Sequence, residues 1–139
     1  MKLTKELEQM YEKAYEAYLN SYSPYSKFKV GACLLMKNGE YIIGTNIENA
    51  SYGLTNCAER SAIFNTISQG YNYKDIKEIV IIADTEKPVS PCGACRQVMA
   101  EFLKPNTIVT MFNLNKEYLQ MTINELLPYS FDKGDLDDK

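Results

Sequence analysis

The sequence has no histidine among its 139 residues. Histidine is the usual general base near neutral pH and the commonest metal ligand. Its absence excludes Ser-His-Asp and Cys-His nucleophilic sites, together with any histidine-ligated metal. Acid–base chemistry near neutral pH must therefore use a perturbed carboxylate, a cysteine, a lysine or a metal-activated water.

The sequence also lacks a long apolar run and an excess of basic residues. Its longest apolar run, residues 79–83, is too short to span a bilayer, and residues 1–7 lack the apolar core of a signal peptide. The net charge is -3, whereas nucleic-acid-binding proteins usually carry a basic face. We therefore expect a cytoplasmic protein that binds neither membrane nor nucleic acid, with its cysteines reduced.

The length and composition predict a single domain. Hydrophobic residues make up 45% of the chain and charged residues 24%, as in ordinary globular proteins. The chain shows no internal repeat and no linker long enough to separate domains. We expect one domain over residues 1–131, followed by a polar tail over residues 132–139.

Hydrophobic periodicity and turn residues predict the order of helices and strands. An amphipathic helix is expected first, then a hairpin turning at Asn38-Gly39, then alternating helices and strands. This order predicts a three-layer α/β/α fold, with a mixed five-stranded sheet and helices on both faces. The expected helices are 4–19, 57–69 and 93–103; the expected strands are 27–36, 40–46, 77–84 and 107–112; and segment 116–127 is ambiguous, a short strand followed by a helical turn.

Three cysteines and one carboxylate form the most informative pattern. Cys92 and Cys95 are three residues apart, so both lie on one face of a helical turn. With Cys57 they offer three thiols, the number of protein ligands that a catalytic zinc site uses. A redox pair or a structural zinc site are the alternatives, but a structural site needs a fourth ligand. Cys33, the remaining cysteine, lies mid-strand and is expected to pack in the core.

Charged neighbours of these cysteines have two possible roles each. Glu59 could move protons at a metal site, or could simply complement the dipole at a helix N-terminus. Three thiolates over-neutralise Zn²⁺ by one unit, so an arginine donating to the sulfurs would restore the acidity of the metal. Arg60 is the first candidate for this role and Arg96 the second. A solvated position on a helix face is the alternative for both.

The motif Cys57-Ala58-Glu59 with Pro91-Cys92-x-x-Cys95 is similar to the signature of the zinc-dependent nucleoside and nucleobase deaminases. From about residue 22 to residue 131, the chain resembles the small homotetrameric cytidine deaminases. Five segments in order carry the resemblance: 28–32, 46–52, 56–60, 91–97 and 127–131.

The resemblance implies a function and a role for each site residue. The implied reaction is hydrolytic deamination of cytidine, and of deoxycytidine, in pyrimidine salvage: a zinc-bound hydroxide attacks C4 while a glutamate moves the protons. The implied roles are one zinc per subunit on Cys57, Cys92 and Cys95; proton transfer by Glu59; stacking near the pyrimidine by Phe28; binding of a ribose hydroxyl by Asn46 and Glu48; contact with the base by the backbone of Ala58 and the Ser90 carbonyl; and completion of a neighbouring subunit's site by Tyr52 and Phe131.

Other interpretations stay open at this point. The chain could deaminate another base or nucleoside analogue, such as guanine or blasticidin S. A cytosine deaminase acting on nucleic acid agrees less well with the acidic composition. A structural zinc module that binds a protein partner is the alternative from another class. Phe28 and Tyr52 could also be core residues without a role in binding.

Overall fold

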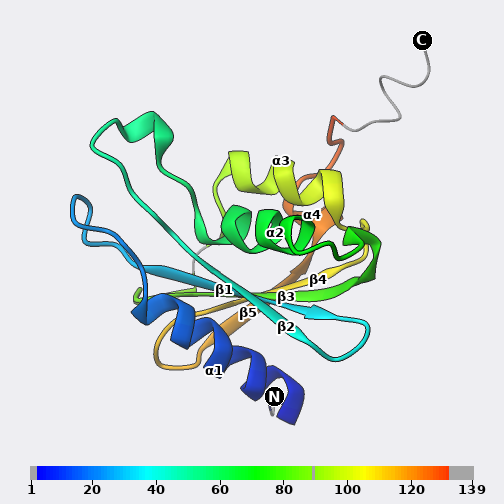
Figure 1. Cartoon of the computed structure of the whole chain (residues 1–139). Helices are drawn as coiled ribbons and strands as arrows, with labels where there is room; N and C mark the ends of the chain where they lie inside the picture. The colour runs from blue at the N-terminus through cyan, green and yellow to red at the C-terminus, as the bar shows by residue number, and fades with distance from the viewer. Residues whose placement is uncertain (1–2, 89, 132–139) are drawn as a thin grey trace.

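A mixed five-stranded sheet lies at the centre of the computed structural model, which describes residues 3–88 and 90–131 (Figure 1). The strand order is β2-β1-β3-β4-β5, with β3 and β4 parallel and every other neighbouring pair antiparallel. The predicted fold class is therefore confirmed. The strands are β1 (Val30–Met36), β2 (Tyr41–Thr45), β3 (Ile76–Ala83), β4 (Ile108–Phe112) and β5 (Tyr118–Thr122). The predicted tail, residues 132–139, lies outside the described residues.

Helices cover both faces of this sheet (Figure 1). Helix α1 (Lys5–Leu19) packs on one face, and α2 (Ala58–Ser68), α3 (Gly93–Phe102) and α4 (Ile123–Leu126) pack on the other. Two short 3₁₀ turns, Tyr52–Leu54 and Tyr73–Asp75, were not predicted. In the described part of the chain, none of the helices combines the length and the apolar character needed to span a bilayer.

The central strands are apolar because both of their faces are covered. Along β1, alternate side chains enter two separate cores: Cys33 packs with Met10 and Phe112 beneath α1, whereas Leu34 packs with Ile63 beneath α2 and α3. The same alternation holds along β3. The apolar residues of α1 recur with the period of a helix, so they form one buried stripe. Thr4 caps this helix by accepting a hydrogen bond from the Leu7 amide (3.1 Å).

Two glycines set the hairpin and the position of α2. Gly39 lies in the β1–β2 turn with a φ of 90°, a conformation that residues with a Cβ rarely adopt. Gly44 lies in β2 directly beneath α2. A Cβ on Gly44 would lie 2.3 Å from the Ala62 amide nitrogen and 2.6 Å from the Ala58 carbonyl oxygen. Glycine at this position therefore lets α2 lie directly on the sheet.

The structure differs from the prediction at the ends of the hairpin. The first strand begins at Val30 and not at residue 27: Lys27 has a φ of 63°, which is not extended, and residues 27–29 lie outside the strand. The second strand ends at Thr45, one residue before Asn46. The ambiguous segment 116–127 resolves into β5 and α4, and a capping box between Thr122 and Glu125 starts the helix.

Candidate active site

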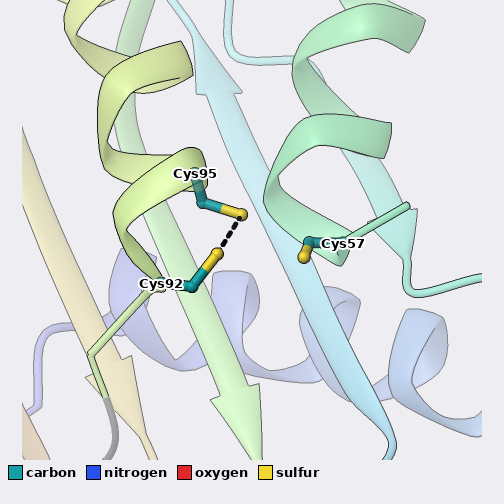
Figure 2. A group of neighbouring side chains, drawn as sticks. All are labelled: Cys57, Cys92 and Cys95. Carbon is teal, nitrogen blue, oxygen red and sulfur yellow. Dashed lines mark hydrogen bonds between the residues drawn. The ribbon is translucent and has the colours of Figure 1, made fainter. Parts of the chain in front are cut away.

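The N-termini of α2 and α3 bring three thiols to one point (Figure 2). Cys57 is the N-cap of α2 and Cys92 is the N-cap of α3, both with extended dihedral angles, and Cys95 lies in the first turn of α3. All three sulfur atoms lie within 4.8 Å of one another, and those of Cys92 and Cys95 are 3.4 Å apart. The partial positive charge of two helix N-termini favours the thiolate form of these ligands.

The geometry of this cluster fits a tetrahedral zinc ion. A Zn–S bond of about 2.3 Å in tetrahedral geometry places sulfur atoms about 3.8 Å apart, close to the spacing observed here. A fourth thiol is absent from the cluster among the described residues. Cys33 is buried on the opposite face of the sheet, beneath α1. The cluster therefore offers three ligands, as an open catalytic site does, and not the four of a structural site.

Arg60 supplies a positive charge to the cluster. Its Nη2 donates to the Cys57 sulfur at 3.1 Å. Its Nε is buried and, within the part of the chain that the structure describes, has no hydrogen-bond partner. The Cys95 thiol and the Arg60 guanidinium lower the pKa of the Cys57 thiol to about 5. Arginine is thus placed to offset the negative charge of three thiolates.

Glu59 lies in the first turn of α2, two residues after the first thiol. Its side chain is only 5% exposed, and burial raises the pKa of its carboxyl above the ordinary value. Because Cys57 is the N-cap and has non-helical dihedral angles, Cys57 and Glu59 line the same cavity although they are only two residues apart. A buried carboxylic acid with a raised pKa can both accept and donate a proton near neutral pH.

A cavity of about 500 Å³ opens above the cluster. Its volume suits a small organic ligand. Phe28, which is 42% exposed, and the start of α2 both line it. The predicted site residues that line it are Phe28, Asn46, Glu48, Tyr52, Cys57, Ala58, Glu59, Ser90 and Cys92. Residues from five separate segments of the sequence thus meet at one cavity.

Asn46 and Glu48 are buried although the strand ends before them. Ile47 continues the extended chain through isolated bridges to Tyr22 and Asn56. The side chains of Asn46 and Glu48, which are 7% and 5% exposed, therefore point to the same side, while Ile47 is half exposed. Both side chains bind the loop that precedes β1: Asn46 donates to the Phe28 carbonyl at 2.8 Å.

Four predicted site residues lie outside the cavity lining. Cys95 is buried behind it within the cluster, and Arg60 lies beside Cys57. Arg96 donates to the Pro91 carbonyl (2.9 Å), the Leu126 carbonyl (2.8 Å) and the Ser90 hydroxyl (2.7 Å). Of the two candidate arginines, Arg60 therefore hydrogen-bonds to a thiol, whereas Arg96 hydrogen-bonds to oxygen atoms. Phe131 is 59% exposed, and its carbonyl accepts from Gln97 at 2.7 Å.

The family model for the cytidine and deoxycytidylate deaminase zinc-binding region matches residues 4–111. The chain belongs to this family. Its cofactor is zinc, and the cluster of three thiols is positioned to bind it.

Relatives of this deaminase extend the similarity over nearly the whole chain. A cytidine deaminase from Halalkalibacterium halodurans is 52% identical over 127 residues, which are 91% of this chain and 95% of the relative. One from Sporosarcina psychrophila is 46% identical over 131 residues, covering 94% and 95%. The crystal structure of cytidine deaminase from Burkholderia pseudomallei superposes with a TM-score of 0.88 at 42% identity, covering 93% of this chain and 100% of that one.

Sequence reasoning missed several residues that line the deaminase cavity. Ser26, Thr55 and Pro91 contribute to its wall. Ser26 lies in the polar loop before Phe28, and its role depends on contact with Glu48, 22 residues further along the chain. Serine in such a loop is ordinary turn chemistry, so the sequence carried no signal that would single it out.

Proposed function

We propose that this protein hydrolyses cytidine and deoxycytidine to uridine and deoxyuridine, with release of ammonia, in pyrimidine salvage. The observation that carries the proposal is the convergence of a buried carboxyl, Glu59, and a cluster of three thiols at one cavity of about 500 Å³, which is lined by Glu59 and by two of the thiols, Cys57 and Cys92. The family and the names of its relatives support the same reaction.

Glu59 is the residue proposed to move protons. Zinc, when bound, lowers the pKa of a coordinated water towards about 7, so that it can act as a nucleophile at neutral pH. The Glu59 carboxylate accepts a proton from the attacking water and delivers it to N3 of the ring, which makes C4 more electrophilic. After the oxygen has bonded to C4, Glu59 accepts the second proton from that oxygen and passes it to the amino group, which leaves as ammonia when the C4–N bond breaks. The raised pKa of its buried carboxyl supports both directions of transfer.

Asn46 and Glu48 are proposed to bind one sugar hydroxyl. The Asn46 amide uses one N–H on Phe28, and its oxygen accepts from Val30 and Ser21. One Glu48 oxygen accepts from the Tyr25 and Ser26 amides, and the other from the Ser26 hydroxyl. By valence, one N–H of Asn46 and one lone pair of Glu48 remain. A donor beside an acceptor is the complement of a single hydroxyl group.

The charge of the cavity favours a nucleoside over a nucleotide. Its lining includes two carboxyl groups, from Glu48 and Glu59, and no lysine or arginine among the described residues. A phosphate group would normally be bound by arginine, lysine or a helix N-terminus. The N-termini of α2 and α3 are occupied by the cysteines of the thiol cluster, since Cys57 and Cys92 are their N-caps. We therefore propose that the substrate is the unphosphorylated nucleoside.

The base is proposed to lie between Phe28 and the start of α2. Phe28, Ala58 and Ser90 all line the cavity, which supports stacking of the ring on Phe28 and contact of its polar atoms with the Ala58 backbone and the Ser90 carbonyl. Tyr52 and Phe131 are 67% and 59% exposed. Aromatic side chains so exposed suit burial against a second copy of the chain.

We therefore propose a homotetramer whose subunits complete one another's sites with Tyr52 and Phe131. Light scattering alongside the activity assay tests this assembly, and a fully active monomer would contradict it. A reducing compartment, the cytoplasm, is proposed because all four cysteines are free. Residues 1–131 are proposed to act as one catalytic domain.

A zinc measurement paired with an ultraviolet assay for loss of cytidine tests the function. The purified protein should hold about one zinc per chain and convert cytidine and deoxycytidine to uridine and deoxyuridine. Deoxycytidylate, guanosine and blasticidin S serve as comparison substrates. Stoichiometric zinc without turnover of cytidine would instead favour a structural module or a deaminase of another substrate.

A further inference from the structure

The loop over residues 21–29 forms one wall of the cavity, and side chains hold it in place. This loop carries Phe28. Its turn requires a left-handed backbone at Lys27, with a φ of 63°, a conformation that a residue with a Cβ adopts only at some cost. The Lys27 amide donates to the Ser23 carbonyl at 3.0 Å. Contacts from outside the loop must therefore stabilise this shape.

The Glu48 side chain provides three of these contacts. One of its carboxylate oxygens accepts from the Tyr25 amide at 3.0 Å and from the Ser26 amide at 3.1 Å. The other accepts from the Ser26 hydroxyl. Glu48 is only 5% exposed, and a buried carboxylate needs such donors to remain ionised. The Ser26 hydroxyl is the largest cause of a lowered pKa at Glu48, and the nearby charge of Lys27 adds to it.

The hydroxyl of Ser26 also contacts the segment that carries the aromatic ring. Its oxygen accepts a hydrogen bond from the Phe28 amide at 3.0 Å. A single hydroxyl group thus joins the Glu48 carboxylate to the backbone of Phe28. The Ser26 hydroxyl therefore connects Glu48, which is proposed to bind the sugar, to Phe28, which is proposed to stack on the base.

We propose that Ser26 is a positioning residue for sugar recognition, which holds one Glu48 oxygen against the loop so that its remaining lone pair faces the ribose hydroxyl. This inference rests on the proposed function. A side chain fixed by hydrogen bonds meets the substrate without losing rotamer freedom on binding. Without the Ser26 hydroxyl, the Glu48 carboxylate could rotate. The Phe28 backbone would still be held by the Asn46 side chain, which donates to its carbonyl at 2.8 Å, so stacking on the base should persist.

The test compares substrates with and without the sugar hydroxyl. Ser26→Ala should lower kcat/KM for cytidine about tenfold, as expected for one hydrogen bond to a charged group, chiefly through KM. The same variant should change kcat/KM for 3′-deoxycytidine less than about twofold, because that substrate lacks the 3′ hydroxyl. We take the 3′ hydroxyl as the one that Glu48 binds, since deoxycytidine, which lacks the 2′ hydroxyl, is also a proposed substrate. Ser26→Thr keeps the hydroxyl and should restore most of the activity on cytidine. Zinc content should not change in either variant.

Further variants make the result specific. Ser68→Ala removes an exposed hydroxyl at the end of α2, away from the cavity, and should behave as wild type. In a Glu48→Ala background, Ser26→Ala should add little further loss, because a residue that acts through Glu48 has nothing left to position. If Ser26→Ala does not fold, Ser26→Cys replaces it, because cysteine is similar in volume and a much weaker hydrogen-bond donor. The same comparison of cytidine with 3′-deoxycytidine then tests the role of Ser26, with the larger loss again expected on cytidine.

The outcomes separate this inference from the proposed function. Equal losses of kcat/KM on cytidine and 3′-deoxycytidine, or additive losses with Glu48→Ala, would overturn the role of Ser26 while the wild-type enzyme still deaminates cytidine. A wild-type protein that holds zinc but does not turn over cytidine would reject the proposed function itself.

Discussion

Replacing Gly44 with alanine should impair both stability and activity, because α2 lies directly on β2 at this position. The added Cβ would lie 2.3 Å from the Ala62 amide nitrogen, whereas ordinary contacts begin at 3.4 Å. The atoms it meets belong to the helix backbone, so α2 must retreat by roughly 1 Å. Overpacking of this kind costs about 1–3 kcal/mol, and contact with backbone places Gly44→Ala at the upper end. We expect Tm to fall by roughly 5–10 °C.

The same displacement should affect catalysis, since α2 carries Cys57 and Glu59 while α3 carries the other two thiols. A misplacement of about 1 Å can cost about 100-fold in rate. Tm, zinc content and kcat/KM for cytidine measure the three effects. Gly53→Ala is the matched control, because nothing lies within 4 Å of a Cβ there. A Gly44→Ala variant with the Tm and kcat/KM of wild type would refute the argument that this glycine sets the position of α2.

Four other predictions concern single side chains of the site and core. Glu59→Gln should keep zinc and Tm but lose about 10²–10⁴-fold in kcat; a loss below about tenfold would show that another group carries the protons. Arg60→Ala should lower zinc affinity or turnover by about 10–100-fold, and wild-type values for both would remove Arg60 from the metal's environment. Cys92→Ala should lose most of the zinc and Cys33→Ala should retain it, measured by metal analysis. Burial raises the pKa of the Cys33 thiol to about 12, so the native thiol stays protonated as the pH rises through the ordinary range of a cysteine. Mass spectrometry should find Cys33 unmodified by iodoacetamide at pH 8 until the protein is unfolded, and its contribution to stability should be lost as pH rises towards 12.

The helices and central strands could be predicted because their signals are local. The apolar stripe and the Thr4 cap predicted α1 to within a residue at its start, and Asn38-Gly39 predicted the hairpin. The prediction was wrong at residues 27–29, which alternate like a strand but lie in a turn before it, with a left-handed backbone at Lys27. That turn depends on contacts with Asn46 and Glu48, some 20 residues later in the chain. A local pattern cannot report such contacts.

The residues that form the site could be predicted better than the hydrogen bonds that each of them makes. Cysteine spacing and the absence of histidine indicated a three-thiol cluster, and the structure brings those three sulfurs together. The choice between Arg60 and Arg96 could not be made from sequence, because both follow a cysteine in a helix. In the structure, Arg96 reaches the Leu126 carbonyl, 30 residues away. Only the packing of α4 against α3 decides between the two.

The absence of histidine and the placement of Arg60 are connected by charge. Neutral imidazole ligands would leave a zinc site with net positive charge, whereas three thiolates leave it with one negative charge. Two helix N-termini and one guanidinium lie against these sulfurs, and each favours the thiolate without adding a ligand to the metal. The buried Glu59 would otherwise face a centre of like charge, and its ionisation would be opposed further. We therefore propose that in this chain, which has no histidine, Arg60 supports both the acidity of the bound metal and the protonation range of Glu59.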